Sequence, residues 1–406
     1  MTNLPQGWEV KKLGEISEII TGSTPSKNNL DFYGKDYPFF KPSDFEQGYF
    51  LENAGDNLSK LGFDKARQLP PKTILVVCIG SLGKVALTRV IGSCNQQINA
   101  IIPHKNIIAE YIYYYCISSK FQSILFSKAP QTTLAILNKT EFSKLEIIYP
   151  KNIKEQERIV GILDESFAKI DESIKILEQD LLNLDELMQS ALQKAFNPLK
   201  DNAKENYKLP QGWEWKSLNS VLLKTSNINP CDFNENKFYY IDISSIDNKN
   251  FCICDIKIID KQNAPSRARK DVLCGDILYA TTRPNLKNIA INYYDFNNIV
   301  ASTGFCVLRA NKNLNNKYLF FFLLSDIFDK NISKYIRGTQ YPSVSDKDVF
   351  NSKIPLPPLQ EQEQIASHLD ELSSHVKNLK QNYQAQIKDL QELKNSLLDK
   401  AFKGNL

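Results

Sequence analysis

The most constraining feature of this sequence is a duplication at half its length. Three motifs return in the same order: residues 4–9 at 209–214, residues 155–157 at 361–363, and residues 194–196 at 400–402. The first is displaced by 205 residues (209 minus 4) and the others by 206 (361 minus 155, 400 minus 194). Solenoid repeats have much shorter periods, of roughly 20–50 residues. The chain is therefore predicted to consist of two equivalent units related by a pseudo-twofold axis.

Composition places the protein among ordinary globular chains. Its 406 residues are 42% hydrophobic and 24% charged, which is enough material for two or more cores. No apolar run approaches the roughly 18 residues of a membrane span, and the start lacks a basic segment followed by an apolar one. We therefore expect a cytoplasmic protein, in whose reducing surroundings the eight cysteines are free thiols.

Charge is distributed unevenly along the chain. Subtracting Asp and Glu from Lys and Arg gives +3 for residues 1–150 (16 minus 13) and −4 for 151–206 (8 minus 12). The same count gives +6 for 207–357 (20 minus 14) and −1 for 358–406 (6 minus 7). Differences of this size also arise by chance. If they carry meaning, a phosphate-binding surface belongs on the two basic segments.

After residue 150 the hydrophobic pattern changes to a period of 3.5, the a/d seam of a coiled coil. The seam comprises Leu163, Phe167, Ile170, Ile174, Leu177, Leu181, Leu184, Met188, Ala191 and Ala195. No Pro or Gly interrupts residues 162–197, and Pro198 ends the helix. At 1.5 Å per residue, about 40 residues make a rod of roughly 60 Å, which is too long to bury its seam on one compact domain.

A second helix of this kind follows the Pro-Pro pair at 357–358 and stops before Gly404. Its predicted seam comprises Leu369, Leu372, Val376, Leu379, Tyr383, Ile387, Leu390, Leu393, Leu397 and Ala401. This seam is less regular, because Lys380 and Lys394 stand at positions that are apolar in the first helix. Helices from equivalent halves pair most simply antiparallel within one chain. A homodimer closed by each seam is the alternative.

Residues 1–150 and 207–357 share one series of elements: a buried strand, a polar loop with a cation, a second strand and a helical run. These are residues 73–79, 80–84, 85–87 and 108–119 in the first segment, and 276–280, 281–287, 289–291 and 317–328 in the second. The predicted fold class is α+β. Two mixed α/β domains are separated by two long antiparallel coiled-coil helices, with pseudo-twofold internal duplication.

No catalytic constellation is visible in the sequence. Residues 80–84 (Gly-Ser-Leu-Gly-Lys) lack the spacing of a phosphate-binding loop, and neither a glycine-rich nucleotide fingerprint nor an Asn-Pro-Pro-aromatic tetrapeptide occurs. Cys231, Cys252, Cys254 and Cys274 lack the paired spacing of a zinc site, so free thiols are expected. We predict no catalytic residue and no metal site in this chain.

Nucleic-acid binding fits the loops of the globular segments better. Arg, Lys, Asn and Gln match base edges in the major groove, and Lys, Ser and Thr also hold phosphates. The candidates are Ser81, Lys84, Arg89, Gln96, Gln97, Thr132 and Thr133 in the first segment, and Arg283, Asn285, Lys287, Arg337, Gln340, Tyr341 and Ser343 in the second. Each alone is ordinary loop surface. Their occurrence on a duplicated basic scaffold favours them as a set.

These motifs resemble a known family. Leu-Pro-x-Gly-Trp opens each half, Pro-Pro-Leu-Gln-Glu-Gln at 357–362 precedes a long helix, and Lys-Ala-Phe closes each helix. Together they resemble the specificity (S) subunit of Type I restriction-modification enzymes over essentially the whole chain. In that family each globular segment is a target-recognition domain that reads one half of a bipartite DNA site. The helices are conserved spacers that set the gap between the half-sites and dock the methyltransferase subunits.

The resemblance implies a specific domain organisation and set of partners. Residues 1–150 and 207–357 become the first and second target-recognition domains, 151–206 the central spacer helix and linker, and 358–406 the C-terminal spacer helix. Expected partners are double-stranded DNA, two methyltransferase (M) subunits and restriction (R) subunits. S-adenosylmethionine and ATP with magnesium are expected on those partners, with no cofactor in this chain.

Two other functional classes remain as alternatives. One is a non-catalytic, two-headed coiled-coil assembly protein with ligand-binding domains. The other is a nuclease or methyltransferase in its own right, which the missing motifs disfavour. Measuring DNA binding with and without a methyltransferase partner distinguishes the three functional classes: a specificity subunit, an assembly protein, and an enzyme in its own right.

Overall fold

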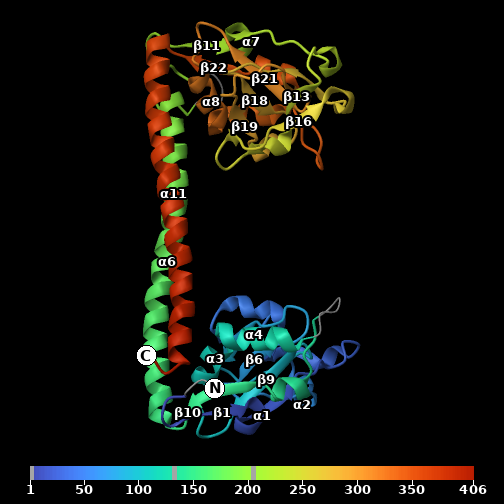
Figure 1. The fold of residues 1–406 in the computed structure, drawn as a ribbon, viewed down its shortest axis with the longest axis vertical. Coiled ribbons are helices and arrows are strands. Elements are labelled where there is room, and N and C mark those ends of the chain that lie inside the picture. The colour runs from blue at the N-terminus through green and yellow to red at the C-terminus, as the bar shows by residue number, and fades with distance from the viewer. Residues whose placement is uncertain (1–3, 130–134, 203–206) are drawn as a thin grey trace. The chain divides into compact units, whose positions relative to one another are not determined.

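The computed structural model describes residues 4–129, 135–202 and 207–406 (Figure 1). The chain divides into two compact units. Unit 1 comprises Met1–Ile176 and Ala385–Leu406, and unit 2 comprises Leu177–Gln384. Each unit contains a globular domain together with part of each of two long helices.

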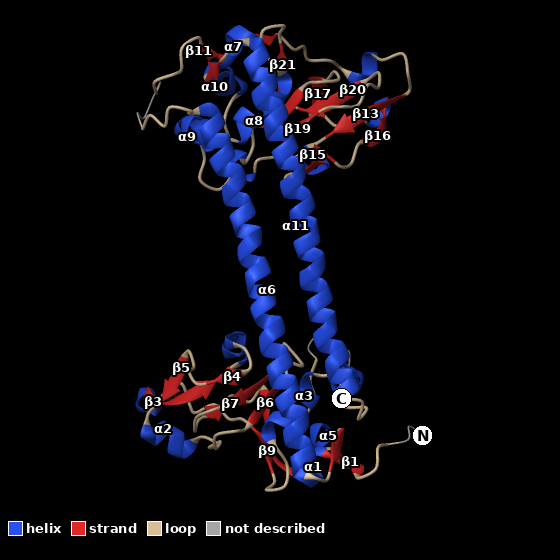
Figure 2. Ribbon diagram, turned by 90° about the vertical axis from the view of Figure 1, so that its left-hand side faces the viewer, coloured by secondary structure: helices blue, strands red, loops and turns tan. Residues whose placement is uncertain are grey.

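The described residues of unit 1 form a five-stranded sheet of order β2-β9-β6-β7-β4, a three-stranded sheet of order β5-β3-β8 and the pair β1-β10 (Figure 2). The strands are β1 (Trp8–Lys12), β2 (Ser17–Thr21), β3 (Tyr33–Phe40), β4 (Phe50–Leu51), β5 (Asp56–Leu58), β6 (Ile74–Val77), β7 (Val85–Thr88), β8 (Ser93–Cys94), β9 (Ile98–Pro103) and β10 (Glu146–Pro150). The short helices are α1 (Leu13–Ile16), α2 (Lys60–Lys65), α3 (Ala109–Ile117), α4 (Ser119–Lys128) and α5 (Lys139–Ser143).

In unit 2 the described residues form two four-stranded sheets, of orders β12-β21-β18-β19 and β16-β13-β20-β17, and the pairs β11-β22 and β14-β15. The strands are β11 (Glu214–Ser217), β12 (Leu222–Leu223), β13 (Lys237–Ile241), β14 (Ile246–Asp247), β15 (Cys252–Ile253), β16 (Lys257–Asp260), β17 (Ala268–Asp271), β18 (Ile277–Ala280), β19 (Ile289–Ile291), β20 (Ile299–Ser302), β21 (Phe305–Ala310) and β22 (Lys353–Leu356). The short helices are α7 (Leu218–Val221), α8 (Asn316–Leu324), α9 (Asp326–Ile332) and α10 (Asp346–Asn351).

The two units repeat one topology, as the sequence duplication predicts. The order β2-β9-β6-β7 in unit 1 corresponds to β12-β21-β18-β19 in unit 2, and every neighbouring pair in both is antiparallel. In the other sheet β3 pairs antiparallel with β5 and parallel with β8, just as β13 pairs with β16 and β20. Strand β17 is an addition of unit 2, and β4 is an addition of unit 1. The predicted α+β fold with internal duplication is therefore confirmed.

One helix of each domain, α3 in unit 1 and α8 in unit 2, packs on the sheet with its tyrosines and phenylalanines. Tyr111 of α3 is fully buried, and its hydroxyl donates to the carbonyl of Ile148 in β10 at 2.9 Å. Its counterpart in α8, Tyr318, donates to the carbonyl of Pro355 in β22 at 2.6 Å. A buried hydroxyl is costly without a partner. These two bonds therefore fix where each helix meets the strand that leads into a long helix.

The two long helices are α6 (Ile153–Phe196, 44 residues) and α11 (Leu359–Ala401, 43 residues). They begin at equivalent positions, 206 residues apart (359 minus 153). In unit 1 the start of α6 shares a core with the end of α11, through Leu163 and Leu398. In unit 2 the end of α6 shares a core with the start of α11, through Leu192 and Leu369 (Figure 1). The helices thus pair antiparallel within one chain, which leaves no need for the homodimer alternative.

Burial along the helices follows most of the predicted seam. Leu163, Ile170, Leu184 and Val376 are buried, whereas Ile174, Leu177, Leu181, Tyr383, Ile387 and Leu390 are half-buried. The assignment of Leu379 and Leu393 to the seam is wrong, because they are 39% and 46% exposed. Lys380 and Lys394 occupy the seam positions instead. Seam residues alternate by four and three along the helix, and a step of four leads from Val376 to Lys380 and from Leu390 to Lys394. One residue earlier on a helix points about 100° away.

The repeated Glu-Gln motif attaches each long helix to its domain. The amide of Gln156 donates to the carbonyls of Pro150 and Asn106, and its oxygen accepts from the backbone amide of Ile108 at 2.9 Å. Gln362 makes the same three bonds, to Pro357, Asn313 and Asn315. Both glutamines are buried, with exposures of 0% and 1%. The motif therefore returns because each helix start needs this connection.

The repeated Lys-Ala-Phe motif attaches the opposite helix end. Phe402, at the end of α11, packs edge-on against Tyr111 and Tyr115 in unit 1, with ring centroids 5.5 and 5.0 Å apart. Phe196, at the end of α6, packs against Tyr318 and Phe322 in unit 2 at 5.1 and 5.4 Å. Each domain thus receives the start of one long helix and the end of the other.

Candidate nucleic-acid interface

In unit 2 the structure brings together two loops that are distant in sequence. The loop 281–287 follows β18, and the loop 337–343 follows α9. The backbone amide of Arg283 donates to the carbonyl of Pro342 at 2.7 Å, and that of Val344 donates to the carbonyl of Thr281 at 2.9 Å. An isolated bridge also joins Thr282 to Ser343. All seven candidates of this segment thus lie on one hydrogen-bonded loop pair.

Arg283 and Tyr341 are both exposed on this loop pair. Tyr341 is 72% exposed, and the Arg283 guanidinium lies over its ring at 5.3 Å from the centroid. Among the residues that the structure describes, no carboxylate lies within ion-pair distance of Arg283. Asn285 and Gln340 are also exposed. A guanidinium supported by an aromatic ring, beside two amides, is suited to hydrogen-bond with base edges or phosphates.

Backbone strain marks the same loop. Arg283 and Lys287 both have φ of +50°, a left-handed conformation that non-glycine residues rarely adopt. Such a conformation costs roughly 1–3 kcal/mol at each residue and persists only where surrounding contacts impose it. The backbone bond from Arg283 to Pro342 is one such contact. The loop is therefore held in one shape before any ligand arrives.

The other two cationic candidates of unit 2, Lys287 and Arg337, are engaged by acids. The ammonium of Lys287 lies 2.6 Å from Asp329 and donates to the carbonyl of Leu324 at 3.1 Å. Burial raises the pKa of Asp329, and the bond from Lys287 only partly offsets this effect. Arg337 lies 3.4 Å from Asp348 but is 67% exposed. Lys287 thus supports the loop from inside, whereas the side chain of Arg337 is largely open to solvent.

Unit 1 contains the corresponding loop pair. The loop 78–84 follows β6, and its backbone bonds to the segment 135–137: Gly80 donates to the carbonyl of Ala135 at 3.3 Å, and Leu137 donates to that of Cys78 at 2.9 Å. A bridge joins Ile79 to Ile136. The candidates Thr132 and Thr133 lie outside the described residues. The same connection therefore recurs at the same sheet end in both units.

The structure gathers four candidates of unit 1 at this loop pair and separates one. Ser81 and Lys84 lie on the loop itself, and both are exposed. The amide of Gln97 donates to the carbonyl of Ile79 at 3.4 Å, and its neighbour Gln96 accepts from the hydroxyl of Thr24. Arg89 lies at the other end of β7, where its guanidinium stacks on Phe50 and pairs with Glu52 at 3.0 Å.

Supporting residues of these loops escaped the sequence analysis. Gln122 of α4 donates to the carbonyl of Gly83 at 2.9 Å and to that of Cys116 at 2.7 Å. Gly83 has φ of +91°, and a Cβ there would lie 2.4 Å from the Gln122 side chain. A side chain at this position would collide with the support. No local pattern in the sequence connects residues 83 and 122.

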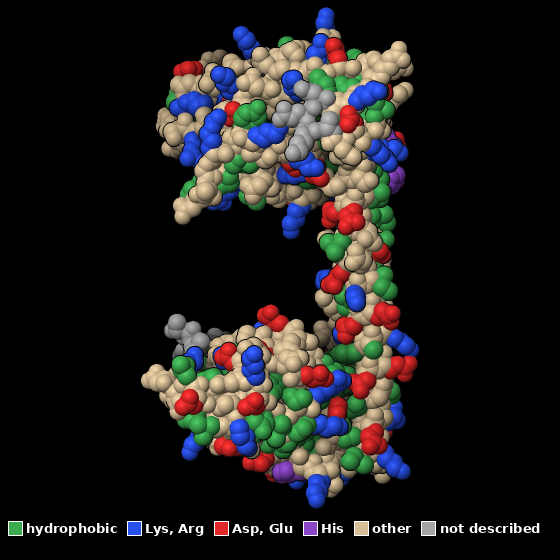
Figure 3. Space-filling view, turned by 180° about the vertical axis from the view of Figure 1, so that it is seen from behind, with side chains coloured by type: hydrophobic (Ala, Val, Ile, Leu, Met, Phe, Trp, Pro, Cys, Tyr) green, Lys and Arg blue, Asp and Glu red, His purple; other side chains and the backbone are tan. Residues whose placement is uncertain are grey.

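Basic side chains are spread over the visible face of unit 2 and do not form one dense patch (Figure 3). This matches the moderate charge of the segment. Overall charge therefore does not single out a surface, and the loop pairs are distinguished by their arrangement. Their exposed Arg, Asn, Gln, Ser and Lys side chains offer many hydrogen-bond donors and few carboxylates, as a polyanion requires.

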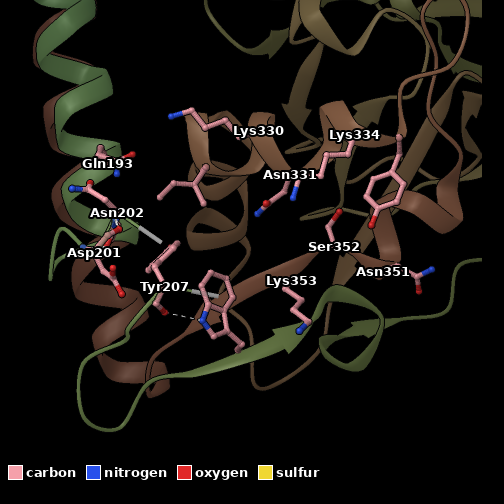
Figure 4. Close-up of a pocket in the computed structure, with 14 residues that line it drawn as sticks. Gln193, Asp201, Asn202, Tyr207, Lys330, Asn331, Lys334, Asn351, Ser352 and Lys353 are labelled. Atoms are coloured by element: carbon pink, nitrogen blue, oxygen red, sulfur yellow. Dashed lines mark hydrogen bonds between the residues drawn. The ribbon is translucent and has the colours of Figure 1, made fainter. Parts of the chain in front are cut away.

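A polar pocket of 630 Å³ in unit 2 is a further candidate site (Figure 4). It lies where α6 ends and is lined by amides and lysines, including Gln193, Asn331 and Lys330. The indole of Trp215 donates to the carbonyl of Tyr207 at its edge at 3.1 Å. Its lining contains neither a nucleophile paired with a base nor a pair of carboxylates. The pocket therefore provides no basis for assigning a catalytic site.

Within residues 4–129, 135–202 and 207–406, no group of three or more His, Cys, Asp or Glu side chains is arranged to hold a metal ion. Cys231, Cys252, Cys254 and Cys274 are exposed free thiols, and Cys252 lies in β15. No helix among the described residues combines the length and apolar character needed to cross a membrane.

Comparison with known proteins gives one consistent family. The family model described as "Type I restriction modification DNA specificity domain" matches the chain twice, at residues 5–181 and 210–389. The HindI specificity subunit of a type I restriction enzyme from Haemophilus influenzae is 37% identical over 188 residues, which are 44% of this chain and 40% of that protein. The MjaIX specificity subunit from Methanocaldococcus jannaschii is 26% identical over 419 residues, covering 99% of this chain and 94% of that protein.

A solved structure has the same fold. A chain from work on complex assembly and conformational transition of the type I R-M system aligns over 100% of both chains with a TM-score of 0.79. The sequences are only 20% identical, so this similarity concerns the fold alone.

Proposed function

The chain belongs to the type I restriction-modification DNA specificity family, and on this premise we propose that it is a DNA-recognition subunit in which each unit reads one half of a bipartite site. The observation that carries the proposal is the recurrence of the loop pair. The loop after β6 in unit 1 and the loop after β18 in unit 2 each bond through the backbone to a segment more than 50 residues later in the chain. Both connections lie at the same end of the equivalent sheets. The frame is shared, whereas the exposed side chains differ. This is the expected arrangement for two readers of different sequences.

The chemistry of the loops favours direct contact with bases. Arg contacts guanine through two parallel bonds, and Asn and Gln do the same with adenine. Arg283, Asn285 and Gln340 supply these groups in unit 2, and Gln96 and Gln97 supply them in unit 1. Lys84, Ser81 and Ser343 provide contacts to phosphates, which position a protein without reading sequence. Specificity would thus reside in a few exposed amides and one guanidinium.

The long helices have a different role in this proposal. Their polar outer faces and continuous length make them a connector of the two readers, which sets the number of base pairs between the half-sites. They also carry the docking surfaces for methyltransferase subunits. Catalysis would then belong to those partners, with S-adenosylmethionine on the methyltransferase and ATP with magnesium on the restriction subunit. This chain itself would act without a cofactor, in the cytoplasm.

The test replaces Arg283 with Ala in the full chain and reconstitutes it with its methyltransferase partner. A lost bidentate contact should cost roughly 1–3 kcal/mol and relax or abolish recognition at one position. Sequencing of methylated DNA should therefore show a change in one half-site and none in the other. Lys312→Ala is the matched control, because this exposed lysine lies beyond the other end of β21.

Two outcomes would contradict the proposal. Normal methylation of the original site by the Arg283→Ala variant would exclude this loop as a reader. A change in both half-sites would show that the units do not read DNA separately. Exchange of residues 207–357 for the equivalent segment of a relative sharpens the same question, because only one half-site should then change.

A further inference from the structure

The seam between α6 and α11 contains two lysines, and both belong to α11. In unit 1 the Lys394 ammonium pairs with Asp171 of α6 and lies 4.8 Å from the ring centroid of Phe167. In unit 2 Lys380 pairs with Asp185 of α6. The lysine side chains are only 22% and 30% exposed, whereas the aspartates are 62% and 65% exposed. Each lysine thus reaches from an apolar seam to an acid at its rim.

The two ion pairs share one register. The residue numbers of Lys394 and Asp171 add to 565, and so do those of Lys380 and Asp185. This is the relation expected for two rungs of one antiparallel ladder. The positions of α6 equivalent to the two lysines, 206 residues earlier, are Ile174 and Met188. The duplication is therefore broken at these two positions, with cations in the seam of one helix only.

This asymmetry would make α11 a poor partner for a second copy of itself. In a hypothetical α11–α11 pair, each α6 residue of the observed pair is replaced by the α11 residue 206 positions later. The numbers of facing residues then add to 771, which is 565 plus 206. Lys394 would then face Lys377, and Lys380 would face Gln391. Two ammonium groups would be opposed, and neither seam lysine would find an acid.

Self-pairing of α6 is disfavoured for the complementary reason. In an α6–α6 pair the facing numbers add to 359, which is 565 minus 206. Asp185 would face Ile174, and Asp171 would face Met188. Both acids would lose their cations. Only the pairing of α6 with α11 satisfies all four charges.

We propose that Lys380 and Lys394 select the partner and register of the helix pair at the expense of its stability. Ion pairs with one exposed member contribute little to stability, because solvent and salt screen them. An apolar side chain in the seam would bury more surface than a lysine does. A polar residue at a seam position is a known means of fixing register and partner in coiled coils. The interaction surface thus fits the other half of this chain and rejects a second copy of the same half.

The first experiment tests whether the charges are coupled. The full-length Lys380→Asp/Lys394→Asp variant should unfold at a temperature at least about 2 °C below that of the wild type, because each aspartate then faces an aspartate. Adding Asp171→Lys and Asp185→Lys restores opposite charges with the signs exchanged, and should recover most of the loss. A fourfold variant no more stable than the double variant would overturn the proposal.

The second experiment tests partner choice. Lys380→Ile/Lys394→Met gives α11 the seam residues of α6, and we expect a higher unfolding temperature together with a fraction at twice the 46.4 kDa mass of one chain by light scattering. The control, Lys388→Ile/Lys400→Met, changes two exposed lysines of α11 outside the seam and should add no such fraction. A seam variant that remains entirely single-chain, or that melts below the wild type, would overturn the proposal, as would an equal dimer fraction in the control.

Discussion

The two units differ in how the space between the long helices and the globular domain is packed. In unit 1 this space is filled by aromatic rings: Tyr49 stacks on Tyr113 with centroids 4.1 Å apart, and Tyr114 packs edge-on against Phe167 of α6 at 5.4 Å. In unit 2 the position equivalent to Phe167, 206 residues later, is Ser373. A cavity of 240 Å³ lies there, lined in part by Ser373, Met188 and Phe321.

The polar contacts around this space diverge in the same way. Asp164 accepts from the hydroxyl of Tyr114 at 2.5 Å in unit 1. Its equivalent in unit 2, Asp370, instead pairs with Lys317 at 2.7 Å. By contrast, the buried glutamines and the phenylalanines at the helix ends make contacts at equivalent positions in both units. The comparison teaches that a few attachment points maintain the duplicated frame, and the packing between them is free to change.

The strongest test removes the phenylalanines at the helix ends. Phe196→Ala and Phe402→Ala should each cost about 3–5 kcal/mol, because both rings are buried against tyrosines and little can refill the space. Thermal unfolding measures the loss, and limited proteolysis should show unit 2 opening first in Phe196→Ala and unit 1 in Phe402→Ala. Leu199→Ala, at a residue that is 49% exposed, is the control. If the two losses differed severalfold, the attachment points would not be equivalent.

The packing difference between the two units can be reversed by exchanging the residues at positions 167 and 373. Phe167→Ser should destabilise unit 1 by about 2–4 kcal/mol, since it opens a cavity among the tyrosines. Ser373→Phe should be tolerated and raise the unfolding temperature slightly, because its ring can enter the existing cavity of unit 2. Ser374→Phe, at an exposed neighbour, is the matched control and should give no gain. A large loss of stability in Ser373→Phe would mean that the cavity cannot accept a ring.

The buried glutamines should behave alike. Gln156→Ala and Gln362→Ala each leave a part-buried backbone amide and two carbonyls without their partner, at a cost of roughly 1–3 kcal/mol. Chemical denaturation of the full chain measures both, with the exposed Gln364→Ala as control. A loss in only one of the two variants would show that the duplicated bonds have unequal importance.

The smallest effect concerns acid stability and should be confined to unit 1. A hydrogen bond from the Tyr149 hydroxyl is the main cause that lowers the pKa of Glu9, and Lys151 adds to it. A carboxylate with a lowered pKa stabilises the folded state above its unfolded pKa, and this contribution is lost as pH falls through the folded value. In unit 2 the residue paired with Glu214, the counterpart of Glu9, is Leu356, just as Tyr149 is paired with Glu9 in unit 1.

Tyr149→Phe should therefore lower the unfolding temperature slightly at pH 7, and this effect should shrink as pH falls below the ordinary range of a Glu carboxyl and Glu9 becomes protonated in the folded state. Melting curves across this range test the difference. Leu356→Phe serves as the control in unit 2 and should show no such dependence on acid. A Tyr149→Phe effect that is constant with pH would assign the tyrosine to packing alone.

Much of the architecture could be predicted from the sequence, because its signals are local or periodic. The repeat offsets fixed the presence of two equivalent units, and the period of 3.5 predicted both long helices and most seam residues. Strand and loop signals located β6, β18 and the loops after them. Leu379 and Leu393 do not belong to the seam. Their apolar side chains suggested seam positions, but the rotation of the helix places the neighbouring Lys380 and Lys394 there instead.

The candidate site depended on information that a linear pattern does not contain. The residue types of the loops suggested nucleic-acid binding, but only the tertiary structure joined 281–287 to 337–343 and moved Arg89 to the far end of β7. The sequence likewise showed that Gln156 and Phe196 have counterparts in the second half. It did not show the residues that they contact, which are the reason for the repetition. Repetition and periodicity arise from neighbouring residues, so they can be read along the chain. The partners of a buried amide, a ring or a seam lysine come from distant segments, and these are decided only when the sheets and helices pack.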